Sequence, residues 1–186
     1  MSRYKLILLP MTSLFLTVIE SIVSYELTQV IFALLIHESA HIFTAKILNV
    51  KCNSPTLLPT GIRLQVDSEQ ISPLKELCVC IAGSTAGIIS GLLISHFTYD
   101  IFDTFVFSSF SLSLLNLLPI KGLDGGEILN IVSNRLFLPD KAYNISKTIS
   151  NLAILMLWFI TITLHMSGEY NLTMLIFTLY LIYSGL

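Results

Sequence analysis

The chain has 186 residues, of which 54% are hydrophobic and only 12% are charged, and its mean hydropathy is +0.80. Soluble domains carry about 25% charged residues, so this composition excludes an ordinary soluble protein and indicates an all-α polytopic membrane protein. The formal net charge of -2 gives no indication of a nucleic-acid partner.

Apolar runs of about 20 residues are long enough to cross a bilayer as helices. The chain has six runs that approach this length, at residues 6–23, 27–48, 77–97, 101–118, 145–165 and 172–183. The first run begins after Arg3 and Lys5 and lacks an A-x-A-like cleavage site, so we interpret it as a retained span and not as a signal peptide. We therefore predict about six transmembrane helices in a single domain, residues 1–186.

The most polar stretch, residues 49–75, separates the second and third spans. Apolar and polar residues alternate at 62–67, which is the period of a half-buried strand, and Thr60 with Gly61 supplies a turn before them. This pattern predicts a small β-hairpin, with a solvated loop as the alternative. An exposed strand edge could bind an extended substrate by adding a strand.

Glycines recur every four residues in the third span, at Gly83, Gly87 and Gly91. On a helix this spacing forms one groove, and small residues in such a groove let a second helix approach closely. Helix packing is therefore their expected role, with direct contact to a substrate as the alternative.

We predict a loop and an interfacial helix over residues 119–141, because the segment at 128–138 is too short and too polar to span a membrane. A loop at 121–127 is followed by a segment whose apolar positions, Ile128, Ile131, Val132 and Leu136, suit a helix that lies at the membrane interface. We expect this segment on the cytoplasmic side.

The distribution of charge predicts the orientation, because Lys and Arg accumulate on the cytoplasmic side of membranes. With the N-terminus inside, all ten basic residues fall at cytoplasmic ends or loops. The opposite turns carry acidic residues, namely Glu20, Glu26, Asp100, Asp103 and Glu169. We therefore expect the N-terminus on the cytoplasmic side.

The second span contains the motif H-E-S-A-H at residues 37–41. His37 and His41 lie on one face of a helix and can hold one metal ion, with Glu38 beside it, which is the HExxH arrangement of zinc peptidases. Ionisable groups are costly inside an apolar helix and usually mark a functional site.

A hydrolytic zinc site usually has three protein ligands, so HExxH leaves one ligand to be found. His96 and His165 lie near the outer ends of their spans, and we expect no metal role for them. Asp124 lies on the same side as the motif. The glycines that follow it, Gly125 and Gly126, permit a close backbone approach, although a loop without metal could use them in the same way.

HExxH in one membrane helix, followed by N-x-x-P at residues 116–119 and L-D-G-G at residues 123–126, resembles the site-2 protease family of intramembrane zinc proteases. In organisation the chain is most similar to the bacterial sporulation branch, which processes a sigma-factor precursor. The resemblance covers most of the chain and implies a bacterial cell membrane.

The resemblance also implies a role for each matching residue. His37, His41 and Asp124 would hold one zinc ion per chain, and Glu38 would be the catalytic acid and base. Asn116 would hold the substrate or its reacting carbonyl, although an asparagine can also pin two helices together.

The chain departs from the family pattern in two motifs. Gly122 stands where the family often has a proline, and Ala82-Gly83-Ser84 lacks the proline of a motif similar to A-G-P. The PDZ domain of some members and the nucleotide-sensing domain of the sporulation branch are also not found in the sequence.

These observations predict an intramembrane zinc endopeptidase that cleaves a membrane-embedded or membrane-attached protein, through a polar cavity open to the cytoplasm. The alternatives are a non-proteolytic membrane protein that binds a metal or a partner, and a membrane peptidase that processes small leader or signal peptides. The sequence does not define a regulatory membrane partner or an oligomeric state.

Overall fold

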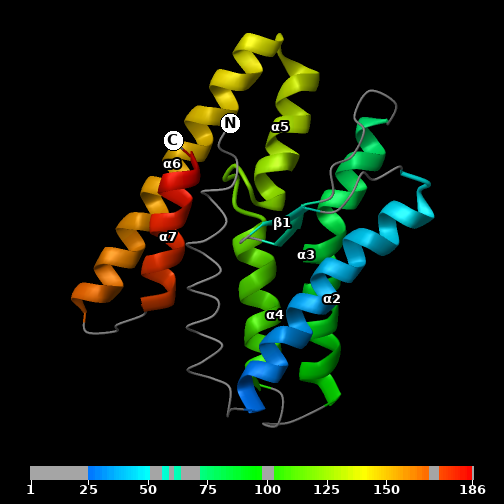
Figure 1. Cartoon of the computed structure of the whole chain (residues 1–186), viewed down its shortest axis with the longest axis vertical. Helices are drawn as coiled ribbons and strands as arrows, with labels where there is room; N and C mark the ends of the chain where they lie inside the picture. The colour runs from blue at the N-terminus through cyan, green and yellow to red at the C-terminus, as the bar shows by residue number, and fades with distance from the viewer. Residues whose placement is uncertain are drawn as a thin grey trace. The chain divides into compact units, whose positions relative to one another are not determined.

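The computed structural model describes residues 25–50, 56–58, 61–63, 72–97, 103–167 and 172–185. Within these residues the elements are, in order, helix α2 (Tyr25–Ile47), strands β1 (Thr56–Leu58) and β2 (Gly61–Arg63), and helices α3 (Pro73–Phe97), α4 (Asp103–Asn116), α5 (Asp124–Leu136), α6 (Pro139–Met166) and α7 (Leu172–Gly185) (Figure 1). The chain divides after Leu117 into two compact units, one containing α2 to α4 and the other containing α5 to α7.

Helices α2, α3 and α4 form a three-helix unit in which each helix packs against the other two. Small residues allow this packing, because Gly87 and Gly91 of α3 face α4. A Cβ atom at Gly87 would collide with Ser113 Oγ, and one at Gly91 would lie 3.2 Å from the ring of Phe110. The predicted packing role is therefore confirmed for these two glycines.

A compact junction joins the end of α2 to the start of α3. Asn49 adopts a left-handed conformation, with φ of 51°, and Val50 N–H donates to the Ala45 carbonyl at 2.9 Å, which is the pattern of a Schellman cap. Lys75 Nζ donates to the Leu48 carbonyl at 2.9 Å. These bonds use main-chain carbonyls that the end of α2 would otherwise leave without a partner.

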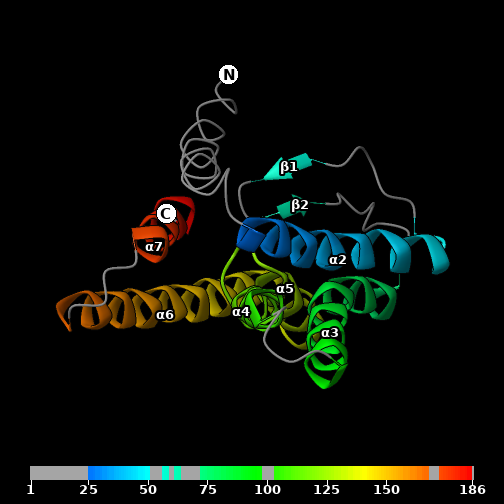
Figure 2. The same ribbon diagram turned by 90° about the horizontal axis from the view of Figure 1, so that it is seen from below.

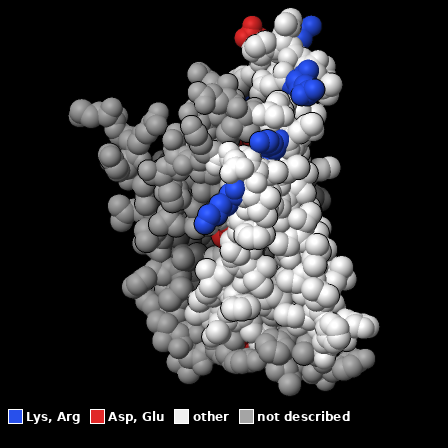
Figure 3. Space-filling view, turned by 90° about the vertical axis from the view of Figure 1, so that its right-hand side faces the viewer, with Lys and Arg blue, Asp and Glu red and all other residues white. Residues whose placement is uncertain are grey.

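The opposite end of the unit is acidic. Glu26 lies in the first turn of α2 and Asp103 in the first turn of α4, and the two helices are joined there by Gln29 Oε1, which accepts from Phe105 N–H at 2.8 Å. Lysines are at the junction end, where Lys46 lies in the last turn of α2. The described surface in Figure 3 is mostly white, with only a few Lys, Arg, Asp and Glu side chains on this face.

In the second unit, α6 packs against both α5 and α7. Helix α5 begins at Asp124, so the predicted loop over 121–127 is wrong for its last four residues. The reason is a close local contact between residues 120 and 126. Gly126 lacks a Cβ atom that would collide with the Ile120 carbonyl, so the chain can turn directly into the helix.

Three of the described helices are long and apolar enough to cross a membrane, at Glu26–Ile47, Pro73–Phe97 and Pro139–Met166. Two further predicted spans are also helical but shorter. Helices α4 and α7 have 14 residues each, which is about 21 Å of helix against a bilayer core of about 30 Å. The predicted span at 6–23 lies outside the described residues. The count of six spans stays a prediction.

Strands β1 and β2 pair in antiparallel register, with Leu57 opposite Ile62. The predicted strand at 62–67 overlaps β2 in two residues, Ile62 and Arg63, and its other four residues lie outside the described part of the chain. Figure 2 shows the strand pair on the side of α2 that faces away from α3.

Candidate metal centre

The HExxH motif lies in the second half of α2, on the face that the other helices cover. Buried residues recur every fourth position along this helix, at Gln29, Ala33, His37, His41 and Ala45. Only 1% of His37 and 7% of His41 are exposed. The predicted placement of both imidazoles on one helix face is therefore confirmed.

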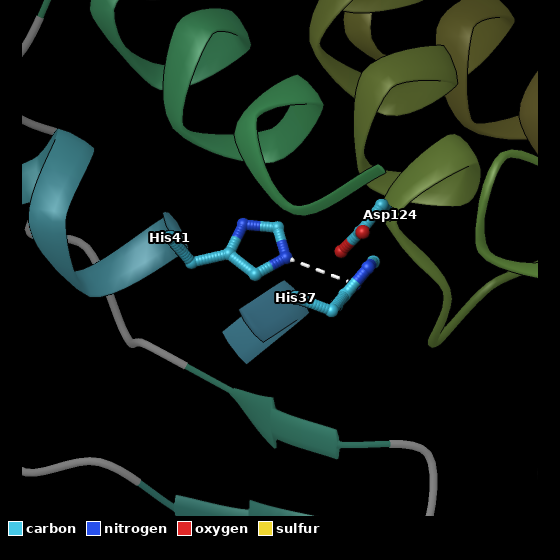
Figure 4. A group of neighbouring side chains, drawn as sticks. All are labelled: His37, His41 and Asp124. Atoms are coloured by element: carbon cyan, nitrogen blue, oxygen red, sulfur yellow. Dashed lines mark hydrogen bonds between the residues drawn. The ribbon is translucent and has the colours of Figure 1, made fainter. Parts of the chain in front are cut away.

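The two imidazoles approach each other through the nitrogens that a metal would bind. His37 Nε2 and His41 Nε2 lie 3.2 Å apart (Figure 4). A tetrahedral zinc ion with Zn–N distances of about 2.0–2.1 Å would hold two nitrogens about 3.3 Å apart. The spacing therefore fits two ligands of one ion.

The main chain of α3 determines which nitrogen of His41 can bind a metal. His41 Nδ1 lies 2.7 Å from the Val79 carbonyl oxygen. Because a carbonyl oxygen only accepts hydrogen bonds, Nδ1 carries the proton, and the lone pair of the neutral ring is on Nε2. Metal-binding histidines usually make such a bond through the second ring nitrogen, which fixes both the tautomer and the ring orientation.

Gly83 of α3 provides the space that the two imidazoles occupy. A Cβ atom at this position would lie 2.7 Å from His37 Nε2 and would collide with His41 Nε2. Gly83 is also four residues after Val79, so one turn of α3 supplies both the carbonyl that orients His41 and the gap beside His41 Nε2. The sequence prediction of a packing role missed this function of Gly83.

Asn116, the last residue of α4, also reaches the histidine pair. Its side chain is 6% exposed, and its Nδ2 lies 3.3 Å from His37 Nε2. The amide is therefore close enough to interact with a group that binds beside His37. The structure thus brings His37, His41 and Asn116 together within the first unit.

Two further predicted site residues, Glu38 and Asp124, are half-buried. Glu38 follows His37 on α2, and Asp124 is the first residue of α5, in the second unit. Figure 4 also labels the Asp124 carboxylate. His96, which we expected to have no metal role, is exposed and lies 13 residues from Gly83, or about 20 Å along α3.

Comparison with known proteins identifies the family. Residues 96–158 match the model of peptidase family M50, a segment that includes Asn116 and Asp124. The chain is 31% identical to stage IV sporulation protein FB of Bacillus subtilis over 121 residues, and 31% identical to a zinc metalloprotease of Methanocaldococcus jannaschii over 137 residues. Residues 96–158 therefore belong to a peptidase family M50 domain.

The two alignments with relatives cover 60% and 68% of this chain, but only 41% and 40% of the relatives themselves. The chain therefore spans about two fifths of the length of the curated relatives that it matches. The solved structure of a site-2 protease from Methanocaldococcus jannaschii matches with a TM-score of 0.70, over 95% of this chain and 86% of that structure's chain. The sequence identity is 23%, so this match shows a common fold.

The residues at the histidine pair that the sequence prediction missed are Val79 and Gly83. A signal for Gly83 was present, because Ala82-Gly83-Ser84 occupies the place of a family motif. Val79 acts through its carbonyl oxygen, an atom that every residue has, so its side chain carries no signal of this role.

Proposed function

We propose that this membrane protein is an intramembrane zinc endopeptidase, which hydrolyses a peptide bond in or near a transmembrane segment of another protein. The observation that carries the proposal is the histidine pair on α2. The Nε2 atoms of two buried imidazoles lie 3.2 Å apart in a helix that is apolar enough to cross a membrane, and a glutamate directly follows the first histidine. A helix that only had to pack would not need these groups.

The proposed ligands of one zinc ion are His37, His41 and Asp124. Two imidazoles and a carboxylate form a donor set that zinc accepts in catalytic sites, with a fourth position left for water or substrate. Asp124 lies within the segment that matches the M50 family model, and its place at the start of α5 gives it a fixed main-chain position.

When bound, zinc lowers the pKa of water toward about 7 and polarises a carbonyl group. Glu38 is then the residue that accepts the proton from the attacking water and delivers it to the leaving amine. The Asn116 amide, 3.3 Å from His37 Nε2, donates to the carbonyl oxygen of the substrate and holds it beside the ligands.

We further propose that the site opens to the cytoplasm and that the substrate is a membrane-embedded or membrane-attached protein. Lys46 at the end of α2 supports this orientation, because it is nine residues, or about 14 Å of helix, after His37. The histidine pair then lies inside the bilayer, toward its cytoplasmic half. Hydrolysis at this depth requires a polar cavity that admits water.

Removal of the metal tests the reaction. Membranes from cells that express the chain should accumulate fragments of membrane proteins, stop doing so after washing with 1,10-phenanthroline, and resume when Zn²⁺ is added back. N-terminal labelling of the fragments measures cleavage. Fragment formation that is unaffected by the chelator would contradict zinc catalysis, and bound zinc without any fragments would favour a non-proteolytic metal-binding protein.

Replacement of the third proposed ligand tests the donor set. Zinc retention by purified Asp124→Ala should fall at least about tenfold, because ligands of a metal site contribute at least as much affinity as the partners that orient them. Asp140→Ala, which removes an exposed carboxylate from the first turn of α6, is the matched control and should retain zinc. Unchanged zinc content in Asp124→Ala would show that another residue is the third ligand.

A further inference from the structure

One hydroxyl group on α6 makes a different hydrogen bond from its neighbours. Thr148, Thr161 and Thr163 each donate to the carbonyl four residues earlier in their own helix. Ser150 instead donates to the carbonyl oxygen of Pro119, at 2.9 Å and 31 residues earlier in the chain. Ser150 is 7% exposed and Pro119 is half-buried, so this bond is partly shielded from the surroundings within the second unit.

Pro119 lies near the start of the short connection that ends at Asp124. In this connection, Ile120 N–H donates to the Leu118 carbonyl at 2.7 Å, and the Ile120 carbonyl accepts from Leu123 N–H at 3.0 Å. Gly122 makes the turn with φ of 97°. Ile120 is fully buried, so the connection is a folded turn that is fixed at its first residues.

The turn is also fixed to the helix that it precedes. The Ile120 carbonyl packs directly against Gly126. A Cβ atom at residue 126 would collide with this carbonyl, so the close contact requires glycine. The side chain of Leu123 is buried, and the Leu123 carbonyl accepts a hydrogen bond from Gly126 N–H at 3.0 Å. A displacement of Pro119 would therefore be passed through Ile120 to the first turn of α5, where Asp124 lies.

We propose that Ser150 is a positioning residue for the metal centre. Its hydroxyl fixes the Pro119 carbonyl to α6, and through the turn at 119–123 it sets the position of the Asp124 carboxylate. This inference rests on the proposed function, in which Asp124 is a zinc ligand. Ser150 itself binds neither metal nor substrate.

Zinc retention of Ser150→Ala tests the inference. The purified variant, exposed to increasing concentrations of a chelator, should lose zinc at roughly 2- to 10-fold lower concentration than the wild type, the range expected for loss of one hydrogen bond. Ser150→Thr keeps a hydroxyl and should restore most of the retention. Thr161→Val is the matched control, because it removes an α6 hydroxyl that bonds only within the helix that carries it, and it should retain zinc.

A double substitution separates positioning from a general loss of stability. Because Ser150 is proposed to act through Asp124, Ser150→Ala should add no further loss of zinc in an Asp124→Ala background. An equal loss in both backgrounds would overturn the inference, as would a lower melting temperature of Ser150→Ala with wild-type zinc retention. Full zinc retention by Asp124→Ala would overturn the ligand set and this inference together, a result distinct from failure of the serine variant alone.

Discussion

Glu38→Gln should lower the rate of peptide cleavage by about 100- to 10,000-fold, the range of a general acid or base, while zinc remains bound. Glutamine keeps the size of the side chain and one acceptor oxygen, but its amide cannot accept a proton at neutral pH. The ligating nitrogens of His37 and His41 are unchanged by the substitution. The measurement is cleavage of membrane proteins by the reconstituted variant, together with its zinc content.

Glu26→Gln is the matched control for this prediction. Glu26 is on the same helix, in its first turn, and is exposed at the end of the unit away from the histidine pair. The control should cleave and bind zinc like the wild type. Retained cleavage by purified Glu38→Gln would refute the role of Glu38, whereas loss of zinc from this variant would mean that the carboxylate acts in binding and not in proton transfer.

Gly83→Ala should reduce zinc retention by at least about 100-fold, which is the upper range for loss of a group that orients a metal ligand. The added methyl group would collide with His41 Nε2 and lie 2.7 Å from His37 Nε2. It would therefore occupy the position of the metal, or force α3 away from α2. Zinc content and chelator competition of the purified variant measure the effect.

Gly91→Ala makes the same substitution two turns further along α3. There the atoms nearest to the methyl group would be those of the Phe110 ring, at 3.2–3.5 Å, and a small movement of this ring can accommodate it. Gly91→Ala should therefore retain zinc within about threefold of the wild type, since a small repacking does not reach the ligands. Equal zinc retention by both variants would refute the proposed role of Gly83.

The sequence predicts the centres of the long helices better than their ends. Hydropathy detects the part of a helix that lies in the membrane, so the predicted second span, 27–48, agrees with α2 within two residues. The third and fifth predicted spans begin four and six residues late, because α3 and α6 start at Pro73 and Pro139, in polar segments that lack the hydrophobic signal. Proline is favoured in the first turn of a helix, and this cue marks both starts.

The histidine pair was predictable because its geometry is local, since residues four apart on a helix share a face. The role of Gly83 was not predictable from the same reasoning. The four-residue spacing places Gly83, Gly87 and Gly91 on one side of α3, but the rotation of α3 relative to its neighbours decides which glycine meets the histidines and which meet α4. That rotation is a property of tertiary packing.

The bond from His41 to the Val79 carbonyl has a consequence for how the centre tolerates change. Every residue has a main-chain carbonyl oxygen, so a substitution at position 79 can change the packing there but cannot remove the hydrogen-bond acceptor. The bond depends instead on the axial alignment of α2 and α3, and a slip of one residue would move the oxygen by about 1.5 Å. The junction formed by Asn49, Val50 and Lys75 opposes such a slip. A cap at the end of a helix, some distance from the histidines, thus keeps the His41 ring in register with the main chain that orients it.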